Sequence, residues 1–356
     1  MLFLLFDVRL NLRHAVGLFM VVAMLLLGFA SVANAQYDQW AIKFDRSPAR
    51  ERLLLNHVQQ IRRHGHASHV DLARALTAPA QNDVERAWLI YRWVAHHLRH
   101  DSRLARQIGD PNRHPVESLL AAGGGSCEVY AKVTAGLLNA VGIEVQEVRG
   151  LTKSGARPLA DGRLNHAWNV VHLEGRWWVM DPTWGAGYVQ DGAFHRSPSD
   201  MFFLIPPDMA VLSHFDPQDR LRTQANSRVS LEVFLAMPES AATLAALGVP
   251  PRRLLDHVKF RSKAALVEVY SQTPKDLRLI DVPISKTLPL KAQYFRIESA
   301  QFEELMVVQG RQWTPMSKKG FLHSIQIDPQ RGELLVMGRR PKQTDFEAIL
   351  SYEVAR

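Results

Sequence analysis

Apolar residues recur at helical spacing between residues 47 and 142, and this pattern predicts three helices. The first is expected over 47–64, where a Ser-Pro pair suits its start and a glycine follows its end. The second is expected to begin near Asn82, with Glu85 as a capping-box partner. The third is expected over 126–142, where a glycine stops it. The apolar face of the second helix consists of Val84, Ala87, Trp88, Tyr91, Val94, Ala95 and Leu98.

Beyond residue 142 the apolar period changes to that of strands. Residues 144–151 alternate between apolar and polar, and a polar loop over 152–165 follows. Residues 166–173 and 176–181 predict the two strands of a hairpin around a Glu-Gly turn. Because helices precede strands instead of alternating with them, the order indicates an α+β fold with an antiparallel sheet.

The pattern changes again near residue 228, where we place a domain boundary. A short helix is expected over 239–247, and short strands follow it at regular spacing. This spacing predicts an all-β, sandwich-like domain over 228–356, after a first domain over 36–227. The expected strands lie at 265–270, 277–280, 294–297, 305–308, 321–327, 333–337 and 348–354.

The first 35 residues have the pattern of a secretory signal peptide. A positively charged start precedes an uninterrupted apolar run over 15–30, and Ala33-Asn34-Ala35 forms a cleavage site. The run is shorter than the ~20 residues of a spanning helix, so we favour cleavage over an uncleaved membrane anchor. We therefore expect an exported protein, periplasmic or extracellular, that contacts the membrane only through this segment if it is retained.

The composition is that of a globular protein, with 47% hydrophobic residues. The formal net charge of +8 is spread along the chain without a nucleic-acid-binding motif, so we expect no nucleic-acid partner. The sequence also lacks a phosphate loop, a dinucleotide fingerprint and zinc-finger spacing. The one cysteine changes this picture most, because a single thiol in an exported chain has no intramolecular disulfide partner.

That cysteine, Cys127, follows a glycine-rich turn and opens the third expected helix. Unpaired N–H groups at a helix start stabilise a thiolate, which is the nucleophilic form, and can bind the oxyanion of a reacting carbonyl. The glycines permit a sharp turn and keep side chains away from the sulfur. A buried, inert cysteine is the alternative interpretation.

His166 and Asp181 lie on the two strands of the predicted hairpin, and the hairpin register decides whether they meet. With a two-residue turn, opposed residues have numbers that sum to 349, so Trp168 faces Asp181 and His166 is a diagonal neighbour. The carboxylate would then fix the imidazole tautomer and leave the other ring nitrogen for Cys127. A three-residue turn would place Asp181 on the opposite face. Each residue alone has an ordinary structural explanation, but the three together favour a catalytic constellation.

These residues resemble the transglutaminase-like superfamily. The resemblance covers about 82–225, and within the superfamily it is greatest to the kyphoscoliosis-peptidase branch. The motifs that carry it are Gly-x-Cys-x-x-Tyr-Ala at 125–131, His-Ala-Trp-Asn at 166–169, Trp-Trp-x-x-Asp-Pro-Thr-Trp at 177–184, Met-Phe-Phe-Leu at 201–204 and Ser-His-Phe-Asp-Pro at 213–217.

The resemblance implies a papain-like core in which Cys127 is the nucleophile, His166 the proton shuttle and Asp181 the orienting residue. It implies a thioester intermediate, with no metal and no cofactor. We expect protease-like hydrolysis of a peptide, protein or peptidoglycan-stem substrate. The alternatives are a protein-crosslinking acyltransferase with the same triad and a non-catalytic module that binds peptides or cell wall. The candidates for substrate contact or for support of the triad are Trp168, Asn169 and Trp184.

Overall fold

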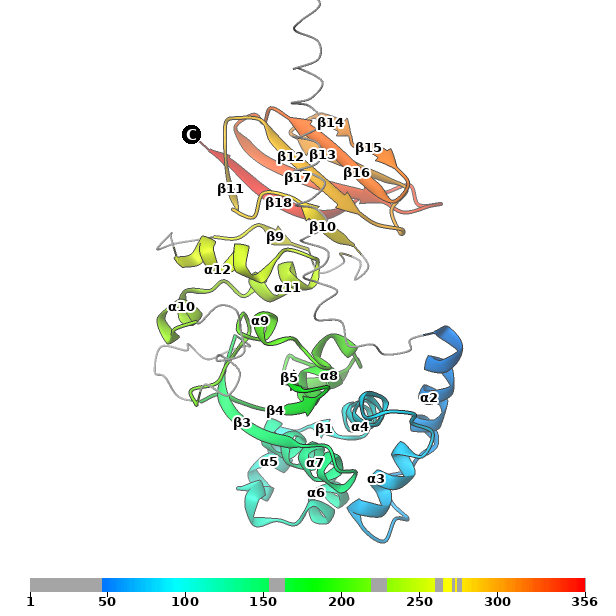
Figure 1. Ribbon diagram of the computed structural model, residues 1–356. Helices are drawn as coiled ribbons and strands as arrows, with labels where there is room; N and C mark the ends of the chain where they lie inside the picture. The colour runs from blue at the N-terminus through cyan, green and yellow to red at the C-terminus, as the bar shows by residue number, and fades with distance from the viewer. Residues whose placement is uncertain are drawn as a thin grey trace, which may run out of the picture. The chain divides into compact units, whose positions relative to one another are not determined.

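The computed structural model describes residues 47–153, 164–218, 229–259, 265–270, 273 and 277–355 (Figure 1). The expected signal segment over 1–35 lies outside these residues, as does the expected domain boundary at 227/228. None of the helices in the described ranges has both the length and the apolar character needed to cross a membrane.

The three helices predicted from the apolar spacing are present as α2 (Pro48–Gln60), α4 (Asp83–His97) and α7 (Cys127–Ala140). Helix α2 is shorter than predicted. Asn82 caps α4 and accepts the N–H of Glu85 at 2.9 Å, while the Glu85 carboxylate accepts the N–H of Gln81 at 2.7 Å. Both predicted capping residues therefore bind backbone groups at the start of this helix.

Short helices lie between these, and most are missing from the prediction because few turns give little periodic signal. Only α11 (Ser240–Ala246) coincides with a short helix that the pattern predicts. The others are α3 (His69–Thr77), α5 (Ser102–Ile108), η2 (Pro111–Arg113), α6 (Val116–Ala122), α8 (Pro182–Ala186), η4 (Asp200–Phe202), α9 (Pro207–Ala210), α10 (Leu231–Ala236) and α12 (Pro251–Lys259).

The predicted strands form an antiparallel sheet in the order β5-β4-β3-β8. These strands are β3 (Val145–Thr152), β4 (His166–Leu173), β5 (Arg176–Met180) and β8 (His214–Phe215). In the hairpin Leu173 opposes Arg176, so the two-residue turn and the register with sum 349 are confirmed. Glu174 and Gly175 both have positive φ, 50° and 78°, as a type I′ turn requires.

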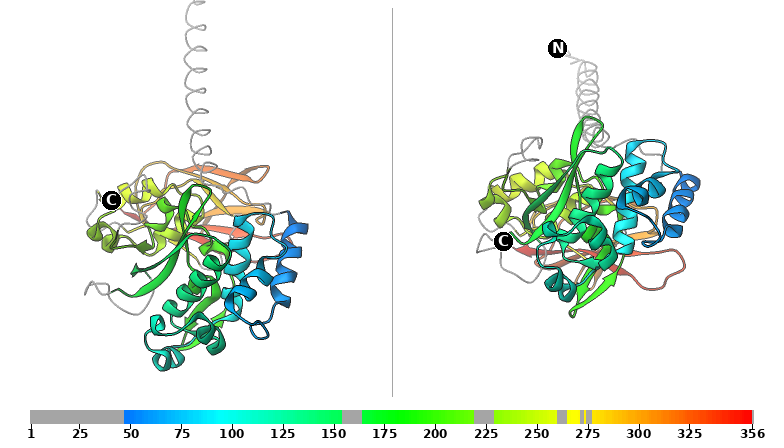
Figure 2. Two further views of the ribbon diagram at one scale, coloured as in Figure 1. Left: turned by 60° about the horizontal axis from the view of Figure 1, so that its bottom comes forward. Right: turned by 90° about the horizontal axis from the view of Figure 1, so that it is seen from below.

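Helix α7 packs against β3 and β4, and α3 and α4 pack against α7. Figure 2 shows these helices, coloured blue to teal, beside the green strands. Under the sheet lies a buried cluster of Val148, Trp168, Val170, Val179, Ile205 and Ala210. The helix-and-antiparallel-sheet core predicted from the element order is therefore confirmed.

The C-terminal part consists of two further sheets that share one core. The first has the order β10 (Arg278–Asp281), β12 (Gln293–Glu298), β16 (Leu322–Ile327) and β15 (Ser317–Lys319). The second has the order β11 (Thr287–Pro289), β18 (Glu347–Ala355), β17 (Gly332–Arg339), β13 (Glu304–Gln309) and β14 (Gln312–Pro315), with β9 (Glu268–Val269) paired to β18. Phe295 and Tyr352 from the two sheets meet at a ring distance of 5.6 Å. The predicted β-rich C-terminal region is thus present, and its buried cluster also includes Leu151 and Phe215.

Candidate active site around Cys127

Cys127 is the first residue of α7 and is partly exposed. The chain reaches it through the short strand β2 (Gly124–Gly125), which pairs in parallel with β1 (Arg99–His100). A Cβ at Gly124 would stand 2.2 Å from the carbonyl oxygen of Arg99, so only glycine permits this approach. The glycine-rich turn thereby places the thiol at the helix start, beside β1.

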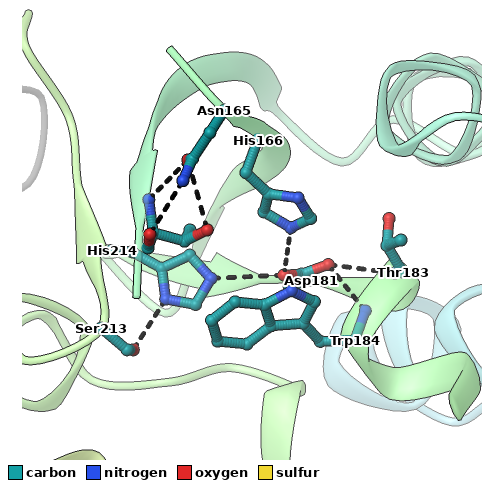
Figure 3. Close-up of polar contacts among 8 residues, drawn as sticks. Asn165, His166, Asp181, Thr183, Trp184, Ser213 and His214 are labelled. Atoms are coloured by element: carbon teal, nitrogen blue, oxygen red, sulfur yellow. Dashed lines mark hydrogen bonds and ion pairs between the residues drawn. The ribbon is translucent and has the colours of Figure 1, made fainter. Parts of the chain in front are cut away.

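His166 begins β4, and Asp181 follows the last residue of β5. Their side chains meet in a hydrogen bond of 2.7 Å between His166 Nε2 and Asp181 Oδ2 (Figure 3). Because Nε2 is directed at the carboxylate, Nδ1 is the ring nitrogen left for Cys127, with which His166 is also hydrogen-bonded. The structure therefore brings together all three residues of the predicted constellation.

The other oxygen of Asp181 caps helix α8. Oδ1 accepts the N–H of Thr183 at 3.0 Å and the N–H of Trp184 at 3.1 Å. The Asp-Pro-Thr turn, an ordinary structural motif by itself, thus fixes the carboxylate that His166 contacts.

A second histidine, His214 in β8, binds the same carboxylate. Its Nε2 lies 3.2 Å from Asp181 Oδ2, and its Nδ1 lies 2.8 Å from Ser213 Oγ (Figure 3). His214 is 4% exposed and Asp181 is 0% exposed. The sequence pattern placed His214 only in a segment that resembles the family, and no spacing in it indicated contact with Asp181.

Burial and pairing set the charges of these three groups. Burial alone would lower the pKa of His166, but the adjacent Asp181 carboxylate raises that pKa to about 10. Burial would raise the pKa of Asp181, but His166 and His214 hold it well below its usual range. Burial lowers the pKa of His214 despite its bond to Asp181, so His214 is neutral near pH 7. His214 Nε2–H therefore donates to the carboxylate, and its Nδ1 accepts the hydroxyl hydrogen of Ser213.

Cys127 and His166 line a single cavity of about 640 Å³. Of the three further candidates, Trp184 lines this cavity, with its ring 5.4 Å from the His166 ring. Trp168 is buried behind it, 5.0 Å from the ring of His214. Asn169 is buried as well and donates to the carbonyl of Ala131 at 3.0 Å, which joins β4 to α7.

The opposite wall of the cavity contains residues that the sequence pattern did not indicate. It is formed largely by a hairpin of β6 (Gly187–Gln190) and β7 (Ala193–Arg196). The signal for this hairpin is present in the sequence as Asp191-Gly192, a pair typical of type I′ turns. Both residues have positive φ, 52° and 77°.

Within the described ranges, His166, Asp181 and His214 form the one group of side chains with metal-ligand geometry. Their ligand atoms lie within 4.8 Å of one another, and two imidazoles with a carboxylate suit several divalent metals. Here, however, both imidazole Nε2 atoms lie at hydrogen-bond distance from Asp181 Oδ2. The geometry is that of a hydrogen-bonded network centred on the carboxylate.

Known proteins with similar sequences share the central part of the chain. Residues 70–182 match the family model of the transglutaminase-like superfamily. Kyphoscoliosis peptidases of Mus musculus and Homo sapiens are 29% identical over 150 residues, which is 41% of this chain and 22% of each relative. The "Lim and transglutaminase domain protein ltd-1" of Caenorhabditis elegans is 30% identical over 187 residues, 48% of this chain and 25% of that protein. The chain thus spans a quarter or less of the length of these relatives.

Among solved structures, one titled "Crystal structure of a TGase" aligns with 49% of this chain and 42% of its own. The sequence identity is 15% and the TM-score is 0.26, which is too low to carry an argument. The resemblance first drawn from the motifs is confirmed by the family match and by the kyphoscoliosis peptidases.

Proposed function

We propose that this chain, whose residues 70–182 form a domain of the transglutaminase-like superfamily, is an exported cysteine hydrolase that cleaves peptide or protein amides. The observation that carries the proposal is the contact of His166 with both Cys127 and Asp181 at the edge of one cavity. Export rests on the sequence of the first 35 residues.

The charges of the site suit attack by a thiolate. With a pKa raised to about 10, His166 is protonated at neutral pH and can pair with a Cys127 thiolate. The sulfur attacks the amide carbonyl carbon, an S–C bond forms, and the oxygen takes up the negative charge. Backbone N–H groups at the start of α7 point toward this position and would stabilise the oxyanion.

Proton transfer through His166 completes the reaction. The imidazolium gives its proton to the leaving nitrogen as the C–N bond breaks, which leaves a thioester on Cys127. A water molecule then gives a proton to neutral His166 and attacks the thioester carbon. The C–S bond breaks, the acid product leaves, and the thiolate–imidazolium pair is restored.

Asp181 and His214 keep His166 in the geometry that these steps need. Four hydrogen bonds reach the Asp181 carboxylate, two at each oxygen. The carboxylate therefore remains ionised and fixed while the charge on His166 changes.

The test is the rate at which iodoacetamide alkylates Cys127 as a function of pH. The chain has one cysteine, so all label is on that residue, and Cys127→Ala supplies the blank. We expect fast alkylation at about pH 5–6 that disappears in His166→Ala, where the thiol should titrate near its free value of about 8.5. Slow alkylation that is identical in both proteins would overturn the proposal and favour a binding module.

A second measurement separates hydrolysis from acyl transfer. A glutamine-containing peptide is incubated with the protein and a primary amine, and the products are identified by mass spectrometry. We expect the free acid; incorporation of the amine would indicate a crosslinking acyltransferase instead.

A further inference from the structure

The outer wall of the cavity is apolar. Its apolar side chains are Trp184, Tyr188, Val189, Phe194 and Phe202. None of the described residues that line the cavity is an aspartate, glutamate, lysine or arginine. A charged substrate side chain would therefore lose its hydration there without gaining a partner, whereas an apolar side chain would be removed from water.

Three of these residues, Tyr188, Val189 and Phe194, belong to the β6–β7 hairpin, and we call them the hairpin wall. Tyr188 is 53% exposed and Val189 is 54% exposed. The Tyr188 ring stacks on His195, its cross-strand partner, with 5.3 Å between ring centroids. Apolar surface that stays exposed, in a fixed orientation, beside a reactive group is typical of a binding surface.

The hairpin is tied to the helix that Asp181 caps. The N–H of Ser197, just after β7, donates to the carbonyl of Ala186 at the end of α8, at 2.9 Å. At Gly187 φ is 149°, and a Cβ there would stand 2.0 Å from the carbonyl oxygen of His195. The base of the hairpin therefore closes only around glycine, directly beside α8.

The second strand is held by the end of α4. The guanidinium of Arg196 donates to the carbonyls of Ala95 and Leu98, at 2.7 and 2.8 Å. These bonds also satisfy two carbonyls at a helix C-terminus. The hairpin wall is thus in place before a substrate arrives, which reduces the entropy cost of binding.

We propose that the hairpin wall selects substrates with an uncharged apolar side chain, aliphatic or aromatic, on the residue whose carbonyl Cys127 attacks. This inference rests on the proposed function, because the acyl part of the substrate is defined by its thioester with Cys127. The cavity volume of about 640 Å³ lies within the ~300–1,000 Å³ of ligand pockets and suffices for such a side chain with its adjoining backbone.

Peptidyl chloromethyl ketones that differ in one residue test the inference on the full chain. The probes are N-acetyl-alanyl-X-chloromethyl ketones with phenylalanine, leucine, glutamine, glutamate or lysine as X. The Cys127 sulfur attacks the methylene carbon, the S–C bond forms and chloride leaves. We expect the second-order labelling rates for phenylalanine and leucine to exceed those for glutamate and lysine at least about tenfold, with glutamine in between.

Variants of the wall locate the preference. In the double variant Tyr188→Ser/Val189→Ser the preference should fall to about threefold or less. The matched control is Tyr294→Ser, because Tyr294 is 46% exposed in β12 of the C-terminal part; it should keep the wild-type preference. Iodoacetamide carries no side chain to select, so its rate at about pH 6 reports on Cys127 and His166 alone.

Each outcome decides between the two proposals. Equal labelling by all five probes, or preference for a charged residue or for glutamine, overturns the inference while fast iodoacetamide labelling keeps the proposed function. An apolar preference that survives in the double variant also overturns the inference, because another surface then selects. Absence of fast iodoacetamide labelling at low pH overturns the proposed function, and the inference with it.

Discussion

The two sides of the cavity differ in how their side chains are held. On the inner side His166, Asp181 and His214 are at most 9% exposed and are joined by side-chain hydrogen bonds. On the outer side Tyr188 and Val189 are more than half exposed and are placed by the backbone of a hairpin. Burial and hydrogen bonds fix protonation states on the inner side, whereas the outer side presents apolar surface without altering any charge. We therefore expect inner changes to alter rate and pH dependence, and outer changes to alter selection.

The largest effect is expected for Asp181→Asn. Oδ1 accepts two backbone N–H groups, so the asparagine oxygen takes that place and its NH₂ group faces both histidine Nε2 atoms. His166 must then accept at Nε2 and carry its proton on Nδ1, the nitrogen that should receive a proton from Cys127 or water. We expect kcat to fall by about 10⁴.

The control for this variant is a measurement that separates tautomer from fold. Far-ultraviolet circular dichroism should remain that of the wild type, and the low-pH alkylation of Cys127 should be lost. A variant that keeps kcat within about tenfold would show that Asp181 does not fix the histidine, and the inner side would then be no more than a buried polar cluster.

A smaller effect is expected for His214, which acts on His166 only through Asp181 and is a positioning residue. His214→Phe removes one hydrogen bond to a charged group, a loss of about 1.5–3 kcal/mol, so kcat should fall by about 10- to 100-fold. KM should stay unchanged, because His214 does not line the cavity.

His214→Gln is the matched variant, since its side-chain amide can still donate to Asp181. It should restore kcat to within about threefold of the wild type and keep the pH profile of alkylation. Equal losses in the phenylalanine and glutamine variants would mean that the ring shape, and not the hydrogen bond, is what the site needs.

The contrast between His166 and His214 also shows what a sequence can reveal. The register between His166 and Asp181 followed from a two-residue turn and the period of two along strands. The position of Cys127 followed from glycines before a helix start. In both cases short-range geometry links residues that are close in the chain or joined by one turn.

His214 could not be found in this way. It meets Asp181 across 33 positions of the chain, through β8, a strand of two residues that pairs with β3. A strand so short has no periodic signal, and only the completed sheet places it. The β6–β7 hairpin is a different case, because its Asp191-Gly192 turn was a usable local signal.

A third prediction concerns stability against pH, where the two histidines should act in opposite directions. The folded pKa of His166 is raised from 6.5 to about 10, so its contribution is complete below about pH 6.5 and is lost as the pH rises toward 10. The folded pKa of His214 is lowered, so its contribution is present above about pH 6.5 and is lost as the pH falls.

Urea unfolding at pH 5, 7 and 9 of the wild type, His166→Gln and His214→Gln checks these signs. The stability advantage of the wild type over His166→Gln should shrink between pH 7 and 9, by at most about 1.4 kcal/mol per pH unit. Its advantage over His214→Gln should instead grow between pH 5 and 7. Slopes of the same sign in both comparisons would contradict the assignment of one charged and one neutral histidine on Asp181.

The smallest effect, and the sharpest limit on the comparison, concerns the stability of the outer side. Tyr188→Ser and Val189→Ser should each change the free energy of unfolding by less than about 0.5 kcal/mol, because the removed surface is already largely in water. Leu138→Ala in α7, a fully buried position, should cost about 2–5 kcal/mol in the same urea titrations. If the hairpin variants cost as much as Leu138→Ala, Tyr188 and Val189 would belong to the folding core, and altered selection in them would reflect lost structure and not a lost binding surface.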